Sequence, residues 1–464
     1  PFKVGAGIVE GQMLTCGYVT VPENRAVHNG RTVRLALAIF KATPGKADPD
    51  PVLRLDGGPG GPSLASFAVY VTGATYKLFV YNHDLIMFDQ RGTGYSQPSL
   101  NCTELINLQY STISQHLSRP ESERMQVQAA RACHDRLVQS GVDLNAYTTR
   151  ENAADVQDII HALGHKQMTL YGVSYGTRLA LTVMHLYPAV IHASVLDSVY
   201  PPQENRTGLV ASSTRSFNVL FQGCAANPTC NSHYPNLKSV FYKLVNDLNA
   251  HPISFQTTNV ASGMSYTASF AGDDLVFWLF SALYATTLIP QLPAAIFGIR
   301  NHNYTLLSQI YGEVEFDDTF SLGMFYSVSC GEDWAFLTQQ DIPPAVQQAA
   351  PEAQPAYANL LQQEYDICQL WNVKQVPRDQ KQAVSSNLPA LVLSGEYDPI
   401  TPPDNGKLTA QTLPHSYYFL FPGQGHGEEL SSQCSNSIIS NFEDNPNQQP
   451  SGACISSMTE PTFA

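Results

Sequence analysis

A serine flanked by glycines at the end of an apolar run is the strongest chemical signal in this 464-residue sequence. The segment Leu170–Thr177 reads LYGVSYGT, so Ser174 lies in a Gly-x-Ser-x-Gly pentapeptide. A serine on a sharp strand-to-helix turn has a strained backbone, which requires small residues two positions before and after it. Gly172 and Gly176 meet this requirement. The pattern therefore predicts a nucleophilic serine held clear of a sheet.

The flanking sequence predicts the elements that such a turn needs. Thr148 and Glu151 form a capping-box pattern, and apolar residues then recur at helical spacing until Gly164. A strand over residues 167–171 leads into the serine, and a helix over residues 175–187 follows it. Helix, strand, turn and helix occur in the order that a catalytic serine turn requires.

Two backbone amides are predicted to stabilise the negative oxygen that forms when the serine attacks a carbonyl. The amide of Tyr175 stands at the start of the helix behind the serine. A second short apolar strand, residues 52–55, runs into DGGPGGP at Asp56–Pro62. Such a segment cannot continue a sheet and costs chain entropy to order. We interpret it as bare backbone close to the substrate, with the amide of Gly58 as the second donor.

A serine hydroxyl needs a base, and the base needs a carboxylate to orient it. Of the 13 histidines, His426 follows a late apolar strand in a glycine-rich loop. Asp398 stands just after the strand at residues 390–395. We predict a triad of Ser174, Asp398 and His426, with the water that completes turnover activated through the histidine. Asp197 also follows a strand and is the rival acid, ranked lower because it precedes the helical segment described next.

The order of predicted elements indicates an α/β protein with an insertion. Strands alternate with helices over the first 200 residues, which is typical of a mainly parallel sheet covered by helices on both faces. Residues 205–385 then have a helical pattern, and strands return near residue 390. We predict a first part of the core over residues 1–204, a mostly helical cap over 205–385 and a second part of the core over 386–464.

The composition excludes several classes of partner. The net charge is −14, from 39 acidic and 25 basic residues, which argues against nucleic acids and anionic membranes. No stretch approaches the length of a transmembrane helix. No cysteine and histidine cluster has the spacing of zinc ligands, and the predicted chemistry requires no metal and no cofactor. The sequence begins at Pro1 without an initiator methionine or signal segment, which indicates a processed or trimmed chain.

The nine cysteines favour an oxidising compartment. Only 14% of the residues are charged, and three Asn-x-Thr acceptor sites begin at Asn101, Asn205 and Asn303. The chain is therefore predicted to be secreted, with free buried thiols in a cytosolic enzyme as the alternative. Sequence proximity and flanking context suggest four disulfides and one cysteine left over, which are Cys102–Cys133, Cys224–Cys230, Cys330–Cys368, Cys434–Cys454 and unpaired Cys16.

A further glycine-punctuated turn, Asp89–Ser96, follows the apolar strand at residues 85–88. It reads DQRGTGYS. We interpret Asp89 and Arg91 as an ion pair that braces this loop beside the site, and a catalytic role for either residue is the alternative.

Several of these motifs together resemble one family of serine peptidases. DGGPG at Asp56–Gly60 is similar to the His-Gly-Gly-Pro-Gly segment of prolyl aminopeptidases, and DQRGTG at Asp89–Gly94 to their Asp-Gln-Arg-Gly-Ser-Gly. With GVSYG, the segment GEYDPITP at Gly395–Pro402 and a cysteine-flanked C-terminus, the chain looks more like the secreted tripeptidyl aminopeptidases. The resemblance extends from Cys16 to Cys454. Asp56 replaces the first histidine of the glycine segment, so strict proline specificity is not expected.

This resemblance implies an α/β-hydrolase fold and a serine exopeptidase that binds the free amino terminus of a peptide under its cap. Exopeptidases of this type recognise the substrate ammonium with cap carboxylates, and Glu332 and Asp333 are the candidates here. Asp273 and Asp274 compete with them, and a purely structural role for all four stays open. We expect a peptide substrate and a monomer.

Two other functions are compatible with the same motifs. A carboxylesterase or lipase-like hydrolase would use the same triad on an ester. A non-catalytic binding protein could be built on a hydrolase scaffold, but such a protein has no reason to retain a serine, an acid and a histidine at three strand ends.

Overall fold

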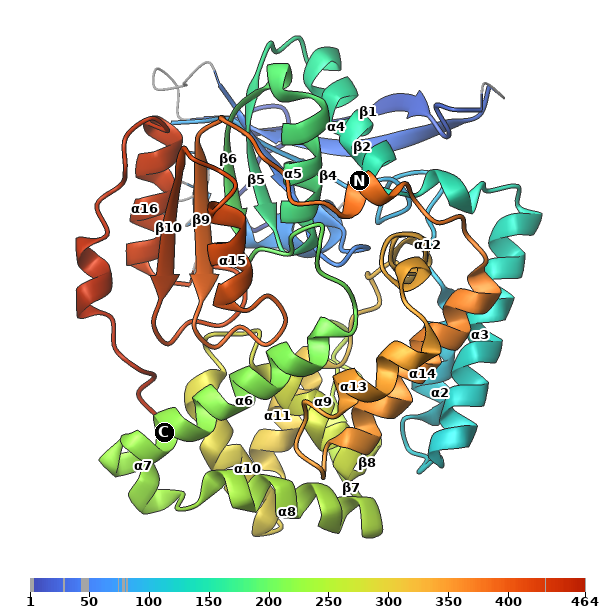
Figure 1. The fold of residues 1–464 in the computed structure, drawn as a ribbon, viewed down its shortest axis with the longest axis vertical. Helices are drawn as coiled ribbons and strands as arrows, with labels where there is room; N and C mark the ends of the chain where they lie inside the picture. Colours follow the sequence, from blue (N-terminus) through green and yellow to red (C-terminus); the bar gives the residue numbers. More distant parts are fainter. Residues whose placement is uncertain are drawn as a thin grey trace.

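The computed structural model describes residues 4–463 except 28–29, 43–49, 74, 77–79, 81 and 430. Pro1 lies outside the described part. A central sheet occupies the upper half of Figure 1, and a largely helical region lies below it.

The central sheet has eight strands in the order β1-β2-β4-β3-β5-β6-β9-β10. The first two pairs, β1 with β2 and β2 with β4, are antiparallel, and all later neighbours are parallel. The strands are β1 (Leu14–Pro22), β2 (Thr32–Phe40), β3 (Val52–Leu55), β4 (Leu85–Phe88), β5 (Met168–Val173), β6 (Ile191–Asp197), β9 (Ala390–Gly395) and β10 (Ser416–Phe421). The predicted mainly parallel sheet is therefore confirmed.

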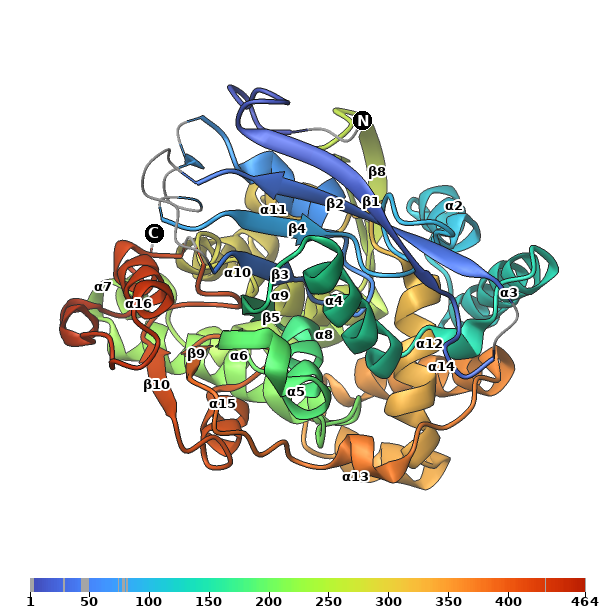
Figure 2. The ribbon, with the colours of Figure 1, turned by 90° about the horizontal axis from the view of Figure 1, so that it is seen from above.

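Helices cover both faces of the sheet (Figures 1 and 2). On one face α4 (Thr149–Ala162), α5 (Tyr175–Leu186) and α15 (Pro403–Ala410) pack on the strands. On the other face α16 (Gln433–Asp444) buries Ile438 and Phe442 against β9 and β10. The strands β3, β4 and β9 are buried along their whole length, as a parallel sheet covered on both faces requires.

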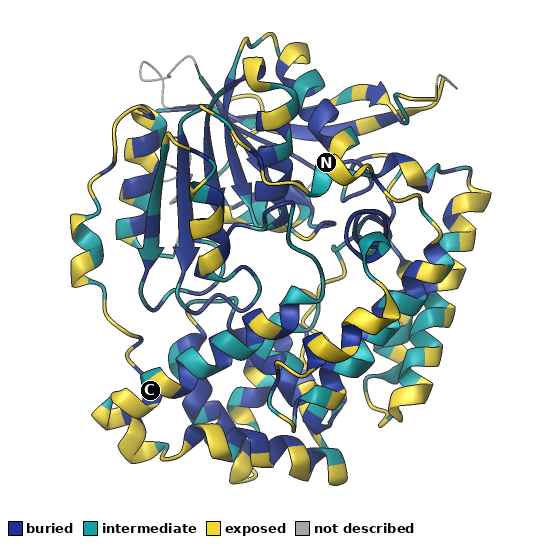
Figure 3. Ribbon diagram, in the orientation of Figure 1, coloured by how far each residue is buried: buried dark blue, intermediate teal, exposed yellow. Residues whose placement is uncertain are grey.

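The inserted region is built mainly of helices that bury their own apolar core. In chain order they are α6 (Gly208–Ala226), α7 (Pro228–His233), α8 (Leu237–Ala250), α9 (Gly272–Ala282), α10 (Leu292–Arg300), α11 (Thr305–Val314), α12 (Leu322–Glu332), α13 (Ile342–Val346) and α14 (Gln354–Trp371). Figure 3 shows that their outer surfaces are exposed and their inner surfaces buried.

A small hairpin interrupts these helices and was not predicted. Strands β7 (Ile253–Thr258) and β8 (Ser265–Phe270) pair antiparallel. In β7 only every second residue is buried, which is the period of a half-buried strand. The sequence itself alternates apolar and polar residues at Ile253 and Phe255 and at Tyr266, Ala268 and Phe270, so the strand signal was present and the helical interpretation was wrong here.

Two further helices, α2 (Thr103–Thr112) and α3 (Arg119–Gln139), belong to the early part of the chain. They pack against each other, and α3 also packs against α14. Their buried residues join the hydrophobic core of the inserted helices rather than that of the sheet. The helical region is therefore assembled from two separate stretches of sequence.

All four predicted disulfides are confirmed, with Cα–Cα distances of 5.0–5.7 Å. Cys16 is unpaired and exposed, as predicted. Three of the bridges lie in the helical region, where Cys330–Cys368 joins α12 to α14. Among the described residues, no helix is both long and apolar enough to cross a lipid bilayer.

Candidate active site

Ser174 occupies the sharp turn between β5 and α5. Its backbone has φ 58° and ψ −124°, which is strained for a residue with a side chain. A Cβ on Gly172 would lie 2.4 Å from the carbonyl oxygen of Gly176, and a Cβ on Gly176 would lie 1.9 Å from the carbonyl oxygen of Leu55. Both positions therefore need glycine, and the predicted turn is confirmed. Thr148 accepts a hydrogen bond from the amide of Glu151 and begins α4 as expected.

Asp398 and His426 are hydrogen-bonded to each other at the ends of β9 and β10. The distance from Nδ1 of His426 to Oδ2 of Asp398 is 2.8 Å. The hydroxyl of Thr401 donates to the same carboxylate oxygen at 2.6 Å, and the amides of Ile400 and Thr401 donate to the other. The carboxylate is fully buried and accepts hydrogen bonds at both oxygens. This leaves Nε2 of His426 as the ring nitrogen directed away from the acid.

The pKa values of this pair move apart. Burial alone would raise the pKa of Asp398, but the charge of His426 and hydrogen bonds from His426 and Thr401 lower it below its usual value. Burial would lower the pKa of His426, but the charge and the hydrogen bond of Asp398 raise it. The ionised carboxylate is thus the stable form, and the histidine is suited to accept a proton.

The rival acid Asp197 has other partners. Its carboxylate accepts hydrogen bonds from the Tyr171 hydroxyl at 2.8 Å and from the amides of Glu428 and Glu429 at 2.8 and 3.2 Å. No hydrogen bond joins Asp197 to His426 among the described residues. Asp197 therefore anchors the chain just after the histidine, and the geometry favours Asp398 as the partner of His426.

The helical region holds the loops that carry the acid and the histidine. The amide of His426 donates to the carbonyl oxygen of Tyr284 at 2.9 Å, and the two rings lie 4.7 Å apart between centroids. The hydroxyl of Thr286 accepts from the Gly425 amide at 2.9 Å. From α6, the Arg215 guanidinium donates to the carbonyl oxygen of Asp398 at 2.8 Å. The site is completed only where the sheet and the helical region meet.

The glycine segment after β3 passes directly over the serine. A Cβ on Gly57 would lie 2.8 Å from Cβ of Ser174, so no larger residue fits there. Gly58 has φ 112°, which a residue with a side chain rarely adopts, and it lines the same cavity as the serine. Tyr175 is the first residue of α5, so its amide has no partner within the helix. The roles of the Gly58 and Tyr175 amides as oxyanion donors stay predictions.

The expected ion pair between Asp89 and Arg91 does not form. Arg91 is fully buried and instead contacts Asp155 with two nitrogens, each at 2.7 Å. Asp89 accepts from the amides of Leu64 and Tyr95. Both residues brace the loop as predicted, but through different partners, because Arg91 points toward α4 rather than back toward its own turn.

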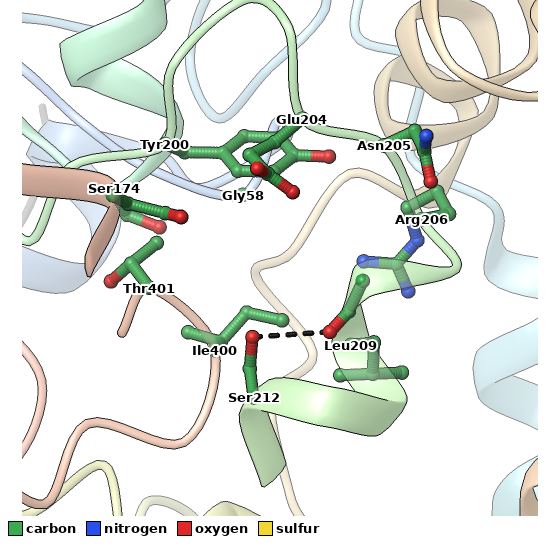
Figure 4. Close-up of a pocket in the computed structure, with 12 residues that line it drawn as sticks. Gly58, Ser174, Tyr200, Glu204, Asn205, Arg206, Leu209, Ser212, Ile400 and Thr401 are labelled. Atoms are coloured by element: carbon green, nitrogen blue, oxygen red, sulfur yellow. Dashed lines mark hydrogen bonds between the residues drawn. The ribbon is translucent and has the colours of Figure 1, made fainter. Parts of the chain in front are cut away.

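Two recesses of different character meet at Ser174. The larger is a cavity of about 550 Å³ whose walls are mainly aromatic and aliphatic, and His426 lines it. The smaller recess, drawn in Figure 4, is lined by Ser174, Tyr200, Glu204 and Arg206 but not by His426. Gly58 and Ile400 belong to both.

Glu204 supplies a carboxylate without an ion-pair partner to the smaller recess. The recess also contains Arg206, but the Arg206 guanidinium is paired with Glu364 at 2.6 Å. Among the described residues, Glu204 forms no ion pair. Burial raises its pKa, and the charges of Arg178 and Lys381 only partly oppose this. Sequence reasoning missed Glu204, although it lies in the loop after β6, as Asp398 lies after β9.

The predicted pair Glu332 and Asp333 does not line either recess at the serine. The Glu332 carboxylate accepts from the amide and the hydroxyl of Thr149, both at 2.6 Å. Asp333 is paired with Arg178 at 3.0 Å and Lys381 at 2.8 Å. Both acids are buried and already have partners within the protein. This corrects our expectation about where a substrate ammonium would bind.

The cations that pair with Asp333 also hold the backbone of Glu204 in place. The Arg178 guanidinium and the Lys381 ammonium, which neutralise Asp333, also donate to the carbonyl oxygen of Glu204 at 2.9 and 2.5 Å. Asp333 therefore helps to hold the backbone of the recess through Arg178 and Lys381, whereas Glu332 holds the start of α4 through Thr149. Asp273 and Asp274, the competing acids, line a separate cavity.

The fold and the geometry at Ser174 are those of an α/β hydrolase, and comparison with known families agrees. Residues 50–267 match the family model described as alpha/beta hydrolase fold. Residues 354–454 match a second model, described as TAP-like protein. The chain therefore has the α/β-hydrolase fold, and its C-terminal part resembles the family described as TAP-like protein.

Three named relatives are similar to this chain over different shares of its length. The chain is 32% identical to a tripeptidyl aminopeptidase of Streptomyces lividans over 218 residues, which is 45% of this chain and 39% of that protein. It is 25% identical to the serine protease Hip1 of Mycobacterium tuberculosis, covering 94% and 86% of the two chains. It is also 25% identical to the carboxylesterase B of that species, covering 92% and 83%. The match to the Streptomyces protein thus spans about two fifths of that protein's length.

Proposed function

We propose that the protein is a serine peptidase that cleaves peptide bonds near a free amino terminus through an acyl-enzyme on Ser174. In this mechanism His426 removes the proton from the serine hydroxyl while the oxygen attacks the peptide carbonyl. Asp398 holds the imidazole in the required tautomer and stabilises its charged form. His426 then donates the proton to the leaving amine, and water activated by the same histidine releases the acyl group.

The glycine segment and the start of α5 would stabilise the oxyanion of this reaction. The amides of Gly58 and Tyr175 are the proposed donors, and each such donor contributes roughly 3 kcal/mol to the transition state. Because Gly58 takes part in the walls of both recesses, a carbonyl at this point can extend its two substituents into different recesses.

The observation that carries the peptidase proposal is the unpaired carboxylate of Glu204 beside the nucleophile. A leaving amine must take its proton from His426, so it must lie in the large cavity that His426 lines. The acyl part then extends toward the small recess, which at about 30 Å³ has room for little more than the terminal ammonium group, and Glu204 would bind that group there. A free amino terminus compensates this half-buried carboxylate, whereas an acetylated one leaves it without an ion-pair partner.

A secreted enzyme fits this proposal. Four disulfides persist in oxidising compartments and are rare in the cytosol.

Ester hydrolysis is the second candidate, because one relative is named a carboxylesterase and the large cavity is mostly apolar. The test uses three matched substrates: an unblocked peptide, its N-acetyl derivative and a blocked ester with the same acyl side chain. Mass spectrometry of the products identifies the bond that is cut. The proposal expects the unblocked peptide to be cut near its amino terminus, with kcat/KM at least tenfold above that of the acetylated peptide. Equal rates for free and blocked peptides, or hydrolysis of the ester alone, would favour the esterase.

A further inference from the structure

A second cavity adjoins the large one and shares two of its walls. It measures about 530 Å³, and Phe277 and Leu360 line both cavities. Helices α9 and α14 run along both. On α9, Asp274 lines the second cavity, and beyond the end of the helix Tyr284 lines the first. The two cavities are successive compartments along the same pair of helices.

The second cavity has the chemistry of a surface that binds a peptide main chain. Facing helices α3 and α14 each present two polar side chains one turn apart, Ser122 with Gln126 and Asn359 with Gln363. Within the described part of the chain none of these four side chains makes a hydrogen bond. Amide and hydroxyl groups can donate and accept, as the alternating N–H and C=O groups of an extended peptide require.

The cavity also contains one carboxylate that has no ion-pair partner among the described residues, although the charge of His116 in the same cavity favours its ionised form. Asp273 is paired with Arg119 through two contacts of 2.5 and 2.9 Å. The neighbouring Asp274 accepts only the amide of Ala271 at 2.7 Å, and it forms no ion pair among the described residues. Asp274 is exposed at the cavity wall. A basic side chain on a bound peptide would compensate this carboxylate.

We infer that the second cavity is an extended subsite for the leaving portion of a long peptide substrate, an inference that rests on the proposed function. The leaving portion starts in the large cavity beside His426 and crosses Phe277 and Leu360 into the second cavity. Asp274 lies eight residues before the end of α9 at Ala282, which corresponds to about 12 Å along the helix, and Tyr284 follows two residues later. An extended peptide covers that distance in roughly four to five residues. Substrates with longer leaving portions, and with a basic residue near that position, are the preferred class.

A length series tests the inference. Peptides share one amino-terminal part and carry leaving portions of one, two, four and six residues. We expect kcat/KM to rise about tenfold between two and six residues, mainly through a lower KM. A wild-type enzyme that cleaves all four equally well overturns the subsite but not the peptidase proposal. An enzyme that cleaves none of them, while it hydrolyses esters, overturns the proposed function itself.

A filling variant with a matched control localises the effect. Asn359→Trp places a large ring in the second cavity, whereas Gln369→Trp adds the same ring at an exposed position of α14 that does not line it. The ratio of kcat/KM between the longest and shortest peptides should fall to near one in Asn359→Trp and stay at the wild-type value in Gln369→Trp. An unchanged ratio in Asn359→Trp contradicts the inference, as does an equal loss in both variants.

The charge of Asp274 is tested with peptides that carry lysine or leucine at the fifth leaving position. Wild type should prefer lysine about threefold to tenfold, and Asp274→Asn should lose the preference because asparagine carries no charge. Its amide oxygen can still accept from the Ala271 amide, so the start of α9 should stay intact. A preference that survives in Asp274→Asn would contradict a role for this carboxylate.

Discussion

The sheet and the helical region contribute different things to the site. The sheet edge carries every group proposed to react, namely Ser174, Asp398 and His426, each at the end of a strand. The helical region carries no such group, but it supplies cavity walls and holds the acid and histidine loops through Arg215 and Tyr284. The difference teaches that reactivity and selectivity are separable here. Changes at the sheet edge should abolish all turnover, whereas changes in the recesses should alter which substrate is used.

Replacing the nucleophile gives the largest expected effect. Ser174→Ala should lower kcat about 10⁴-fold to 10⁶-fold for peptides and esters alike, because it removes the attacking oxygen. It should also prevent covalent labelling by a serine-directed phosphonate, measured by intact-protein mass, while the thermal unfolding temperature changes little. A labelled mutant would mean that another residue is the nucleophile.

The choice between two acids gives the next largest effect. Asp398→Asn should lower kcat by about 10³-fold to 10⁴-fold, because His426 is then held in the wrong tautomer. Asp197→Asn should cost less, since Asp197 contacts the loop after the histidine and not the ring. Steady-state kinetics of both variants on one ester compare them directly. A dead Asp197→Asn beside an active Asp398→Asn would reverse the assignment.

The junction between the two regions should matter for stability. Asp333→Asn leaves the buried Arg178 and the half-buried Lys381 beside a neutral amide, and losing one member of a buried ion pair costs about 3–5 kcal/mol. Denaturant unfolding monitors this loss. Glu332→Gln, which keeps an acceptor for Thr149, serves as the milder neighbouring change. If an Asp333 variant has wild-type stability but an altered substrate preference, the original prediction that Asp333 binds substrate would be favoured again.

The smallest expected effect is a difference between two pH profiles, one set by His426 alone and one set by His426 and Glu204 together. Asp398 raises the pKa of His426, and the base must be neutral, so kcat/KM should rise with pH through that raised value. A blocked ester should show only this limb. A free-amine peptide should show an additional loss at low pH, where Glu204, whose pKa burial raises, becomes protonated and no longer binds an ammonium. Identical acid limbs for both substrates would exclude a role for Glu204.

The parts predicted from sequence are those that a local pattern specifies. The serine turn needs Gly172 and Gly176 at a fixed spacing. Cys224 and Cys230 are only six residues apart, so a single turn brings them within the distance that a disulfide spans. The triad candidates follow from strand ends in chain order, because parallel strands bring their carboxyl ends to one edge.

The recess and its ligand could not be predicted in this way. Glu204 has no motif, and its exposure to the recess depends on Arg178 and Lys381, which are distant in sequence. Glu332 and Asp333 stood out as adjacent acids, but their burial and their cationic partners are properties of the folded chain only.

The central claim is that Glu204 makes this hydrolase require a free amino terminus, and one ratio tests it most directly. The measurement is kcat/KM for an unblocked peptide divided by that for its N-acetyl derivative, in wild type and in Glu204→Gln. Hydrolysis of a blocked ester by the same variant reports whether the triad itself is intact. We predict a wild-type ratio of at least ten that falls to near one in Glu204→Gln, with ester hydrolysis retained. A ratio that is unchanged by the substitution would contradict the account.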